Sequence, residues 1–457
     1  MAITPAFNPP VRILMGPGPS GANPRVLRAM TAPLLGHLDP EFLKIMDNCR
    51  TMLRLVLRTE NEVTLATPGT GTSGMEAAVM NLVQPGDNVV VAVAGYFADR
   101  ICQMAQRAGG KVTRVEAPWG SAVDPEKMAA AVKAAAPVKL IGVVHAETST
   151  GVCTPIEPFG VIAREAGALL LVDCVTSIGG VPVETDKWGA DAVYGGTQKC
   201  LSAPPGVSPI TMSPRAWDVV KSREVPNNSW YLDMALLEAY WDDRRNYHHT
   251  APISMIYALH EALALVLEEG LENRWARHER NGRALQDGLE AMGLMLHADA
   301  AVRLPVLTTV RIPEGVNDAE VRGALLKRHN VEVGGGLGDL RGKVWRIGLM
   351  GESSTPGNVL LFLNSLGKIL REHGYKADVR GAIPPPNPAW CSSSGVGFAL
   401  VYRGEAESRA PSRARCRVRS SPGTLPIRPA IAESATVDRK LKRRTESRRR
   451  PVAGNHA

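Results

Sequence analysis

Long apolar runs are missing from this sequence. No stretch approaches the ~18 uncharged apolar residues that a membrane-spanning helix needs, so we expect no membrane partner. The first residues do not place a basic segment before an apolar one, which argues against a secretory signal. Together these absences predict a protein of the cytoplasm.

Paired cysteines and tandem repeats are also missing. The seven cysteines are scattered, without a Cys-x-x-Cys pair. An odd number of scattered cysteines in a chain of 457 residues indicates reduced thiols rather than a disulfide framework. Hydrophobic residues make up 44% and charged residues 21% of the chain, as in an ordinary globular protein with a buried core.

Positive charge is concentrated at the C-terminal end. Residues 376–457 carry 17 Lys and Arg against 6 Asp and Glu, so the rest of the chain has a net charge of −3 out of a total of +8. Few apolar residues recur there with any period, which predicts a disordered tail. Binding of nucleic acid through this tail is an alternative function. A solvated extension explains the composition more simply, and we expect no nucleic-acid partner.

Buried strands alternate with helices in the first two thirds of the chain. Residues 88–93, 138–144 and 168–172 are continuous apolar runs, which favour strands buried on both faces of a parallel sheet. Residues 73–84 have helical periodicity, and Pro-Gly follows them. The pattern predicts a doubly wound α/β domain.

Composition and periodicity divide the chain into four expected segments. A helical region spans about residues 254–293, and strands near 307–312 and 343–349 with a helix at 356–373 predict a small α+β domain. The expected segments are an N-terminal Pro/Gly-rich arm at 1–23, a large domain at 24–265, a small C-terminal domain at 266–375 and the tail at 376–457.

Lys199 and Asp173 form the most informative pattern. An apolar strand ends at Asp173, and a second strand leads through Gly195-Gly196 to Gln198-Lys199. Pyridoxal phosphate (PLP) enzymes need such a pair, because a lysine forms the Schiff base with PLP and a carboxylate keeps the pyridine nitrogen protonated. We therefore expect Lys199 and Asp173 to be the catalytic residues and PLP to be the cofactor.

A Gly/Thr turn stands before the helix predicted at residues 73–84. Small residues let backbone N–H groups approach a phosphate, and a helix N-terminus favours its negative charge. The same turn would also serve as a plain helix cap, so this signal is weak on its own.

Seven motifs in order carry a family resemblance. They are Gly16-Pro17-Gly18-Pro19-Ser20, Gly69-Thr70-Gly71-Thr72, His145-Ala146-Glu147-Thr148-Ser149-Thr150-Gly151, Asp173-Cys174-Val175-Thr176-Ser177, Gln198-Lys199, Tyr247-His248-His249-Thr250 and Trp345-Arg346-Ile347-Gly348. With them, roughly residues 10–375 closely resemble the class V aminotransferases, in the alanine–, serine– and ureidoglycine–glyoxylate group. The resemblance implies PLP fold type I, with a mainly parallel seven-stranded sheet in the large domain.

The resemblance also implies roles at the cofactor. Residues that hold the PLP phosphate would be Thr70, Gly71, Thr72 and Gln198. Phe97 would stack on the pyridine ring where relatives often carry Trp, unless the register differs by one and Tyr96 does so. Val175 would pack on the opposite face of the ring, and Thr148 would place a hydroxyl near the ring or the substrate.

Substrate and partner contacts are implied in the same way. Arg346 would bind the carboxylate that amino and oxo acids share, since a guanidinium binds a carboxylate through two hydrogen bonds. The arm around Gly18 would lie near the substrate or along the partner subunit. Tyr247 and Thr250 would reach the PLP phosphate of a neighbouring subunit, which predicts a homodimer with shared active sites. Adjacent histidines point in different directions, so we expect no metal there.

The implied reaction is transamination from a small donor, alanine or serine, to glyoxylate. (S)-Ureidoglycine is the alternative donor, and Asn227, Asn228 and Ser254 are candidate residues for discriminating among donors. A lyase or cysteine desulfurase of the same fold is a further alternative. It is disfavoured because desulfurases usually place His before the Schiff-base lysine, where this chain has Gln198.

Overall fold

The structure of the chain is a computed structural model that describes residues 8–378. These residues belong to one compact unit. The basic tail lies outside the described residues except for its first three positions, and so does the nucleic-acid alternative that depends on it. Among residues 8–378, no helix is long and apolar enough to cross a membrane.

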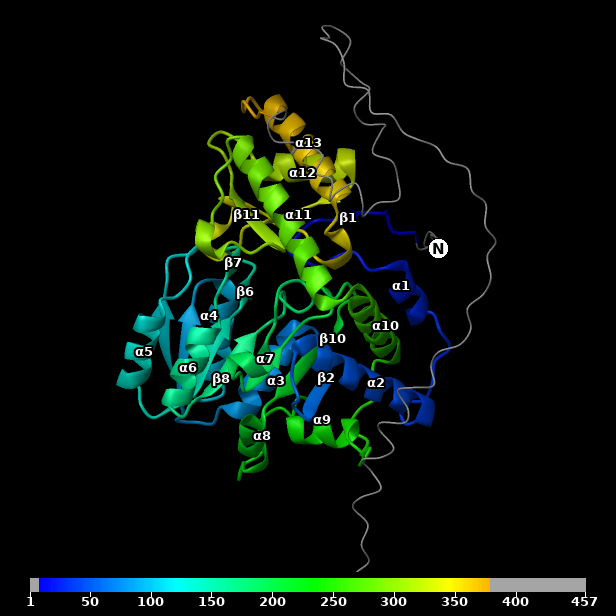
Figure 1. The fold of residues 1–457 in the computed structure, drawn as a ribbon, viewed down its shortest axis with the longest axis vertical. Helices are drawn as coiled ribbons and strands as arrows, with labels where there is room; N and C mark the ends of the chain where they lie inside the picture. Colours follow the sequence, from blue (N-terminus) through cyan, green and yellow to red (C-terminus); the bar gives the residue numbers. More distant parts are fainter. Residues whose placement is uncertain (1–7, 379–457) are drawn as a thin grey trace, which may run out of the picture. The chain divides into compact units, whose positions relative to one another are not determined.

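A seven-stranded sheet forms the centre of the larger part of the fold (Figure 1). In spatial order its strands are β2 (Val63–Gly69), β10 (Gly206–Met212), β9 (Ala192–Tyr194), β8 (Leu169–Asp173), β5 (Val138–Val144), β3 (Asn88–Val93) and β4 (Lys111–Glu116). β10 is antiparallel to both of its neighbours, and the other pairs are parallel. The mainly parallel sheet predicted from the sequence is confirmed.

The apolar runs form strands because helices cover the sheet. Every residue of β8 is buried, as a strand covered on both faces requires. The expected strands at residues 88–93 and 138–144 coincide with β3 and β5. The helices of this part are α1 (Pro24–Met30), α2 (Pro40–Leu57), α3 (Gly71–Leu82), α4 (Tyr96–Arg107), α5 (Pro125–Ala134), α6 (Glu157–Glu165), α7 (Thr185–Trp188), α8 (Pro214–Lys221) and α9 (Met234–Trp241).

Helix α3 differs from its prediction by two residues at each end. It begins at Gly71 rather than at residue 73, because the chain becomes helical directly after the extended residue Thr70. It ends at Leu82, since Val83 is already extended, ahead of the Pro-Gly pair. The shift brings the first turn of the helix to the Gly/Thr motif.

A second, three-stranded antiparallel sheet lies in the C-terminal part. It has the order β11 (Leu307–Arg311), β14 (Val344–Gly348) and β13 (Gly334–Gly335). The helices of this part are α11 (Leu271–Ala291), α12 (Asp318–His329) and α13 (Pro356–Glu372), whereas α10 (Ile253–Glu269) packs against α1 and α2 of the larger part. The helical region expected at 254–293 is two helices, because Gly270 has a φ of +81° and ends the first.

Each sheet has its own hydrophobic core. One cluster runs from Phe42 to Leu271, and another from Ala284 to Ala377 with Met15 added. The predicted boundary near residue 265 stays a prediction. A short hairpin of β6 (Ala146–Glu147) and β7 (Val152–Cys153) follows β5.

The N-terminal arm joins the two sheets. Its β1 (Ile13–Leu14) pairs in parallel with β12 (Val331–Glu332), and the arm is otherwise irregular, as predicted. The amide of Gly348 donates to the carbonyl of Met15 over 2.7 Å. Farther on, the amide of Ser20 donates to the carbonyl of Gln198 over 2.8 Å. The arm therefore runs from the three-stranded sheet to the loop that carries Lys199.

Candidate active site

The site forms where three neighbouring strands end. Val144, Asp173 and Tyr194 are the last residues of β5, β8 and β9, and they pair directly across the sheet. Ligands bind at the carboxyl ends of the strands in open α/β sheets. The strand register thus places Asp173 at the edge where a ligand is expected.

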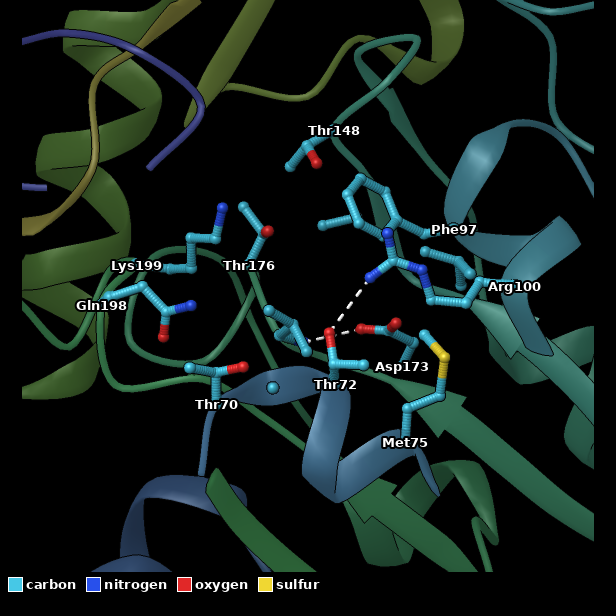
Figure 2. A pocket seen from close by; sticks show the side chains of 14 residues that line it. Thr70, Thr72, Met75, Phe97, Arg100, Thr148, Asp173, Thr176, Gln198 and Lys199 are labelled. Atoms are coloured by element: carbon cyan, nitrogen blue, oxygen red, sulfur yellow. Dashed lines mark hydrogen bonds between the residues drawn. The ribbon is translucent and has the colours of Figure 1, made fainter. Parts of the chain in front are cut away.

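A pocket opens at this edge, and it gathers most of the residues predicted from the sequence (Figure 2). The predicted residues in its wall are Thr70, Gly71, Thr72, Phe97, Thr148, Asp173, Val175, Gln198 and Lys199. Sequence reasoning missed five others, namely Met75, Arg100, Val144, Ala146 and Thr176. Thr176 stands within the Asp173 motif and Ala146 within the His145 motif, whereas the other three belong to no motif.

Asp173 is a buried carboxylate held from within the sheet. Its Oδ1 accepts the amide of Val175 over 2.8 Å, and its Oδ2 accepts the hydroxyl of Tyr194 over 2.8 Å. Burial raises the pKa of Asp173 to about 6, against an ordinary value of 3.8. The group is therefore mostly ionised at neutral pH, in a fixed orientation, and it can hold a proton on a ligand nitrogen.

Lys199 lies beneath the N-terminal arm. Its Nζ donates to the carbonyl oxygen of Pro17. A Cβ added to Gly18, whose φ is +113°, would come within 2.5 Å of that Nζ, so only glycine fits here without displacing the amine. Burial first, and then the charge of Arg346, lowers the pKa of Lys199 to about 8. A substantial neutral fraction at neutral pH makes this amine a nucleophile.

The first turn of α3 has unused hydrogen-bond donors. Thr70 caps the helix without a side-chain hydrogen bond, and no acceptor among residues 8–378 receives the amides of Gly71 and Thr72. Nearby, the buried Oε1 of Gln198 also has no partner in the described chain. Uncapped helix amides attract anions.

Glu147 fixes the start of helix α4. Its buried carboxylate accepts the amides of Phe97 and Ala98 over 3.0 and 3.3 Å, and the hydroxyl of Ser149 over 2.6 Å. Burial raises the pKa of Glu147. Phe97 lines the pocket and Tyr96 does not, which favours Phe97 as the stacking residue.

Arg346 approaches from the three-stranded sheet. In β14 its Nε donates to the carbonyl of Gly335 over 2.7 Å, and its Nη1 donates to the carbonyl of Thr148 over 3.2 Å. The side chain is 7% exposed and forms no ion pair within residues 8–378. Burial lowers the pKa of Arg346 to about 10. A buried guanidinium without an acidic partner can bind a carboxylate.

Comparison with known proteins agrees with this geometry. The family model for class V aminotransferases matches residues 25–339. This chain belongs to the class V aminotransferases. It is 41% identical to the (S)-ureidoglycine–glyoxylate transaminase of Bacillus subtilis (strain 168), over 80% of this chain and 92% of that protein.

Two further relatives extend the comparison. The alanine–glyoxylate aminotransferase of Callithrix jacchus is 38% identical, over 79% of this chain and 88% of its own length. A crystal structure of an alanine–glyoxylate aminotransferase from Nostoc sp. superimposes with a TM-score of 0.79 and 49% identity, covering 81% of this chain and 98% of the other. The chain is thus a transaminase of PLP fold type I, as the sequence predicted.

The pocket of this aminotransferase fits PLP. The unused amides of Gly71 and Thr72 suit a phosphate, the fixed carboxylate of Asp173 suits a pyridine nitrogen, and the amine of Lys199 suits an aldehyde. No cysteine among the described residues lines the pocket, and Cys200 beside Lys199 is buried. The described part of the chain thus gives no support to the desulfurase alternative.

Some predicted residues of the aminotransferase lie elsewhere. Tyr247 is 60% exposed, Thr250 is exposed, and neither lines the pocket. Asn227 donates to Asn81 over 2.9 Å and so holds its loop against α3. His145 packs edge-to-face on Trp188, and burial lowers its pKa to about 4. Within residues 8–378, no group of His, Cys, Asp and Glu could hold a metal.

Proposed function

We propose that this enzyme transfers the amino group of a small amino acid, alanine or serine, to glyoxylate, giving glycine and an oxo acid. The observation that carries the proposal is Arg346, a buried guanidinium without an ion-pair partner among residues 8–378. It does not itself line the pocket but donates to the carbonyl of Thr148, which does. Both halves of such a reaction need a carboxylate to be held next to the lysine amine. Relatives that act on glyoxylate support the choice of acceptor.

PLP, when bound, stabilises the negative charge that develops on the substrate α-carbon. Asp173 holds a proton on the ring nitrogen, which strengthens that effect. The amine of Lys199 binds the aldehyde end of the cofactor. When free of the cofactor, this amine would act as the base and acid that takes a proton from the substrate α-carbon and returns it. Its pKa of about 8 lets the amine both take and give this proton near neutral pH.

Other residues orient the reactants and exclude water. Phe97 would cover one face of the ring and Val175 the other, while Glu147 fixes Phe97 through the backbone. Thr148 contributes a hydroxyl, and its carbonyl holds Arg346. Gly18 forms the arm side of the substrate site, because its missing side chain leaves room beside Lys199.

(S)-Ureidoglycine is the second candidate donor. The observation that favours it is the 41% identity to the Bacillus subtilis enzyme, which is named for that substrate. All three donors carry a carboxylate for Arg346, so they differ only in the group beyond the α-carbon. Discrimination therefore depends on a few contacts to that group.

The visible absorption spectrum of the PLP-loaded enzyme tests the proposal. We expect one donor among alanine, serine and ureidoglycine to bleach the visible band fastest, and glyoxylate to restore it. Lys199→Ala is the control and should lose the band. A wild-type enzyme that takes up PLP but is bleached by none of the donors would refute the proposed substrates. Bleaching by cysteine with sulfide release would favour the desulfurase alternative.

We also propose that the enzyme is a homodimer in which Tyr247 and Thr250 reach the phosphate of the neighbouring subunit. The exposure of both residues supports this, as does the exposed aromatic residue Trp230, which stacks on His248 next to Tyr247. Mixing inactive Lys199→Ala subunits with subunits carrying Tyr247→Ala and Thr250→Ala should restore part of the activity. No restoration, or a monomer by analytical ultracentrifugation, would contradict it. Cell fractionation tests the proposed cytoplasmic location.

A further inference from the structure

Arg100 is a cation in the pocket wall that no motif accounts for (Figure 2). It lies one turn into α4, and its Nη1 donates to the hydroxyl of Thr72 over 3.0 Å. Its Cζ is 5.1 Å from the ring centre of Phe97 and 5.4 Å from that of Tyr96. Two aromatic faces and one hydroxyl thus hold the guanidinium toward the first turn of α3.

The charge of Arg100 is not used within the described chain. No ion pair to Arg100 is formed among residues 8–378. The neighbouring carboxylate of Asp99 is already bonded to Arg114 and to Gln103. A guanidinium stays charged at any physiological pH, so Arg100 is available to an anion in the pocket.

The phosphate group of PLP is the anion that the pocket leaves without a countercharge. The groups assigned to it, residues 70–72 and Gln198, are neutral hydrogen-bond donors. Lys199 is the other cation in the lining of this pocket, and it is committed to the aldehyde end. A doubly charged phosphate is bound most strongly by a guanidinium, which adds full charge to two parallel hydrogen bonds.

We propose that Arg100 binds the PLP phosphate, together with Thr72 and the uncapped amides of α3. The inference rests on the proposed function only in placing the phosphate end of PLP at this helix. Arg100 would then set cofactor affinity, while the aromatic ring of Phe97, on the same helix, positions the pyridine.

Comparing PLP with pyridoxal, which lacks the phosphate, tests this assignment. Arg100→Gln should weaken binding of PLP to the apoenzyme about 10- to 100-fold, the usual effect of losing a charged hydrogen bond. Binding of pyridoxal should change less than about threefold, because that ligand has nothing for Arg100 to bind. Arg100→Lys keeps the positive charge but loses the two parallel N–H donors of the guanidinium. Its affinity for PLP should therefore lie between those of the wild type and Arg100→Gln.

The matched control is Arg107→Gln, on the same helix but exposed and outside the pocket lining. It removes the same charge from α4 and should leave both affinities unchanged. An equal loss of PLP and pyridoxal affinity in Arg100→Gln would overturn the proposal, since it would mean that Arg100 acts through the stacking ring. So would unchanged PLP affinity with a raised KM for the amino donor, which would make Arg100 a substrate residue.

Phosphorus NMR of the bound cofactor gives a readout independent of turnover. A neighbouring cation favours the dianion, so Arg100→Gln should raise the pH at which the bound phosphate changes from dianion to monoanion. An unchanged titration would contradict the contact. These outcomes do not depend on which donor the enzyme uses, so failure of the proposed substrates and failure of this proposal are told apart.

Discussion

The two sheets hold the polar groups of the candidate site in different ways. In the seven-stranded sheet, Asp173 is bonded to Tyr194 of the next strand and to the amide of Val175. In the three-stranded sheet, Arg346 is held by carbonyl oxygens alone, and the buried hydroxyl of Thr309 opposite it has no partner in the described chain. The carboxylate of Asp173 is thus hydrogen-bonded within the protein without a ligand. The guanidinium of Arg346 has no acidic partner among the described residues, so its charge is available to a ligand.

The largest effect should come from Asp173→Asn in the seven-stranded sheet. An amide cannot keep the ring nitrogen protonated, so kcat should fall at least about 100-fold. Steady-state turnover of donor and glyoxylate measures this. Asp191→Asn is the matched control, because Asp191 is a buried carboxylate of the same sheet region, bonded to the amide of Leu170 over 3.0 Å, outside the pocket lining. Asp191→Asn should keep kcat per folded molecule.

Asp173→Asn and Asp191→Asn should have opposite effects on the thermal stability of the apoprotein at pH 8. The folded pKa of Asp173 is raised to about 6, so ionisation of this group opposes folding of the apoprotein as pH rises from about 4 to 6. At pH 8 the Asp173→Asn apoprotein should therefore have a higher Tm than wild type, and the difference should shrink toward pH 5. Asp191→Asn should lower the Tm. A lower Tm for Asp173→Asn at pH 8 would contradict the linkage.

In the three-stranded sheet, Arg346→Gln should raise the KM for amino donor and oxo acid about 10- to 100-fold. The reason is the loss of the charged hydrogen bonds to the substrate carboxylate. Arg346→Lys should recover part of the affinity. Arg341→Gln, an exposed position shortly before β14, is the control that should change nothing. A fall in kcat with unchanged KM would mean that Arg346 does not bind the carboxylate.

Tyr194→Phe removes the hydrogen bond that Asp173 accepts from the neighbouring strand, and it should have a smaller effect than the substitutions above. The hydroxyl of Tyr194 lowers the pKa of Asp173, so its removal should raise that pKa further. A rise of about one pH unit would weaken PLP binding about threefold near pH 6.5 and leave it unchanged at pH 8.5. Cofactor affinity measured across this range tests it. An equal loss at every pH would point to packing instead.

The smallest expected effect on stability comes from making the same Thr→Val substitution once in each sheet. Thr64 in β2 donates its hydroxyl to Asn61 over 2.9 Å and shares a hydrogen bond with Thr211, whereas the buried hydroxyl of Thr309 has no partner. Thr64→Val should lower the free energy of unfolding of the apoprotein by about 1–2 kcal/mol, and Thr309→Val by less than about 0.5 kcal/mol. Denaturant midpoints measure both. Equal losses would show that the hydroxyl of Thr309 contributes as much to stability as the hydrogen-bonded hydroxyl of Thr64.

The seven-stranded part of the site could be predicted because its signals are local. Asp173 ends an apolar strand, and the cradle of residues 70–72 precedes a helix. Since parallel strands end at the same edge, their order in the sequence is enough to bring such residues together. Helix bounds were less certain, because the cap at Thr70 uses no side chain to mark it.

The rest of the site depends on distant contacts. Arg100 looks like any polar residue on an amphipathic helix until the fold sets it against Thr72. The role of Glu147 could not be predicted either, because the backbone amides that donate hydrogen bonds to it lie some 50 residues earlier in the chain. Arg346 was predicted from family resemblance together with the apolar residues that flank it in the sequence, because an arginine within a strand has no local signature of its own. Composition predicted that the arm is irregular and gave no sign that Pro17 meets Lys199.

The path of that arm has a consequence for the order of events during synthesis. Met15 bonds to Glu332 and Gly348, so residues that leave the ribosome first wait for partners that leave it more than 300 positions later. The seven-stranded sheet can assemble well before that, since its last strand ends at Met212. During that interval the arm has no partner strand to hold it over Lys199. We expect the arm to close the active site only after residue 348 has been made.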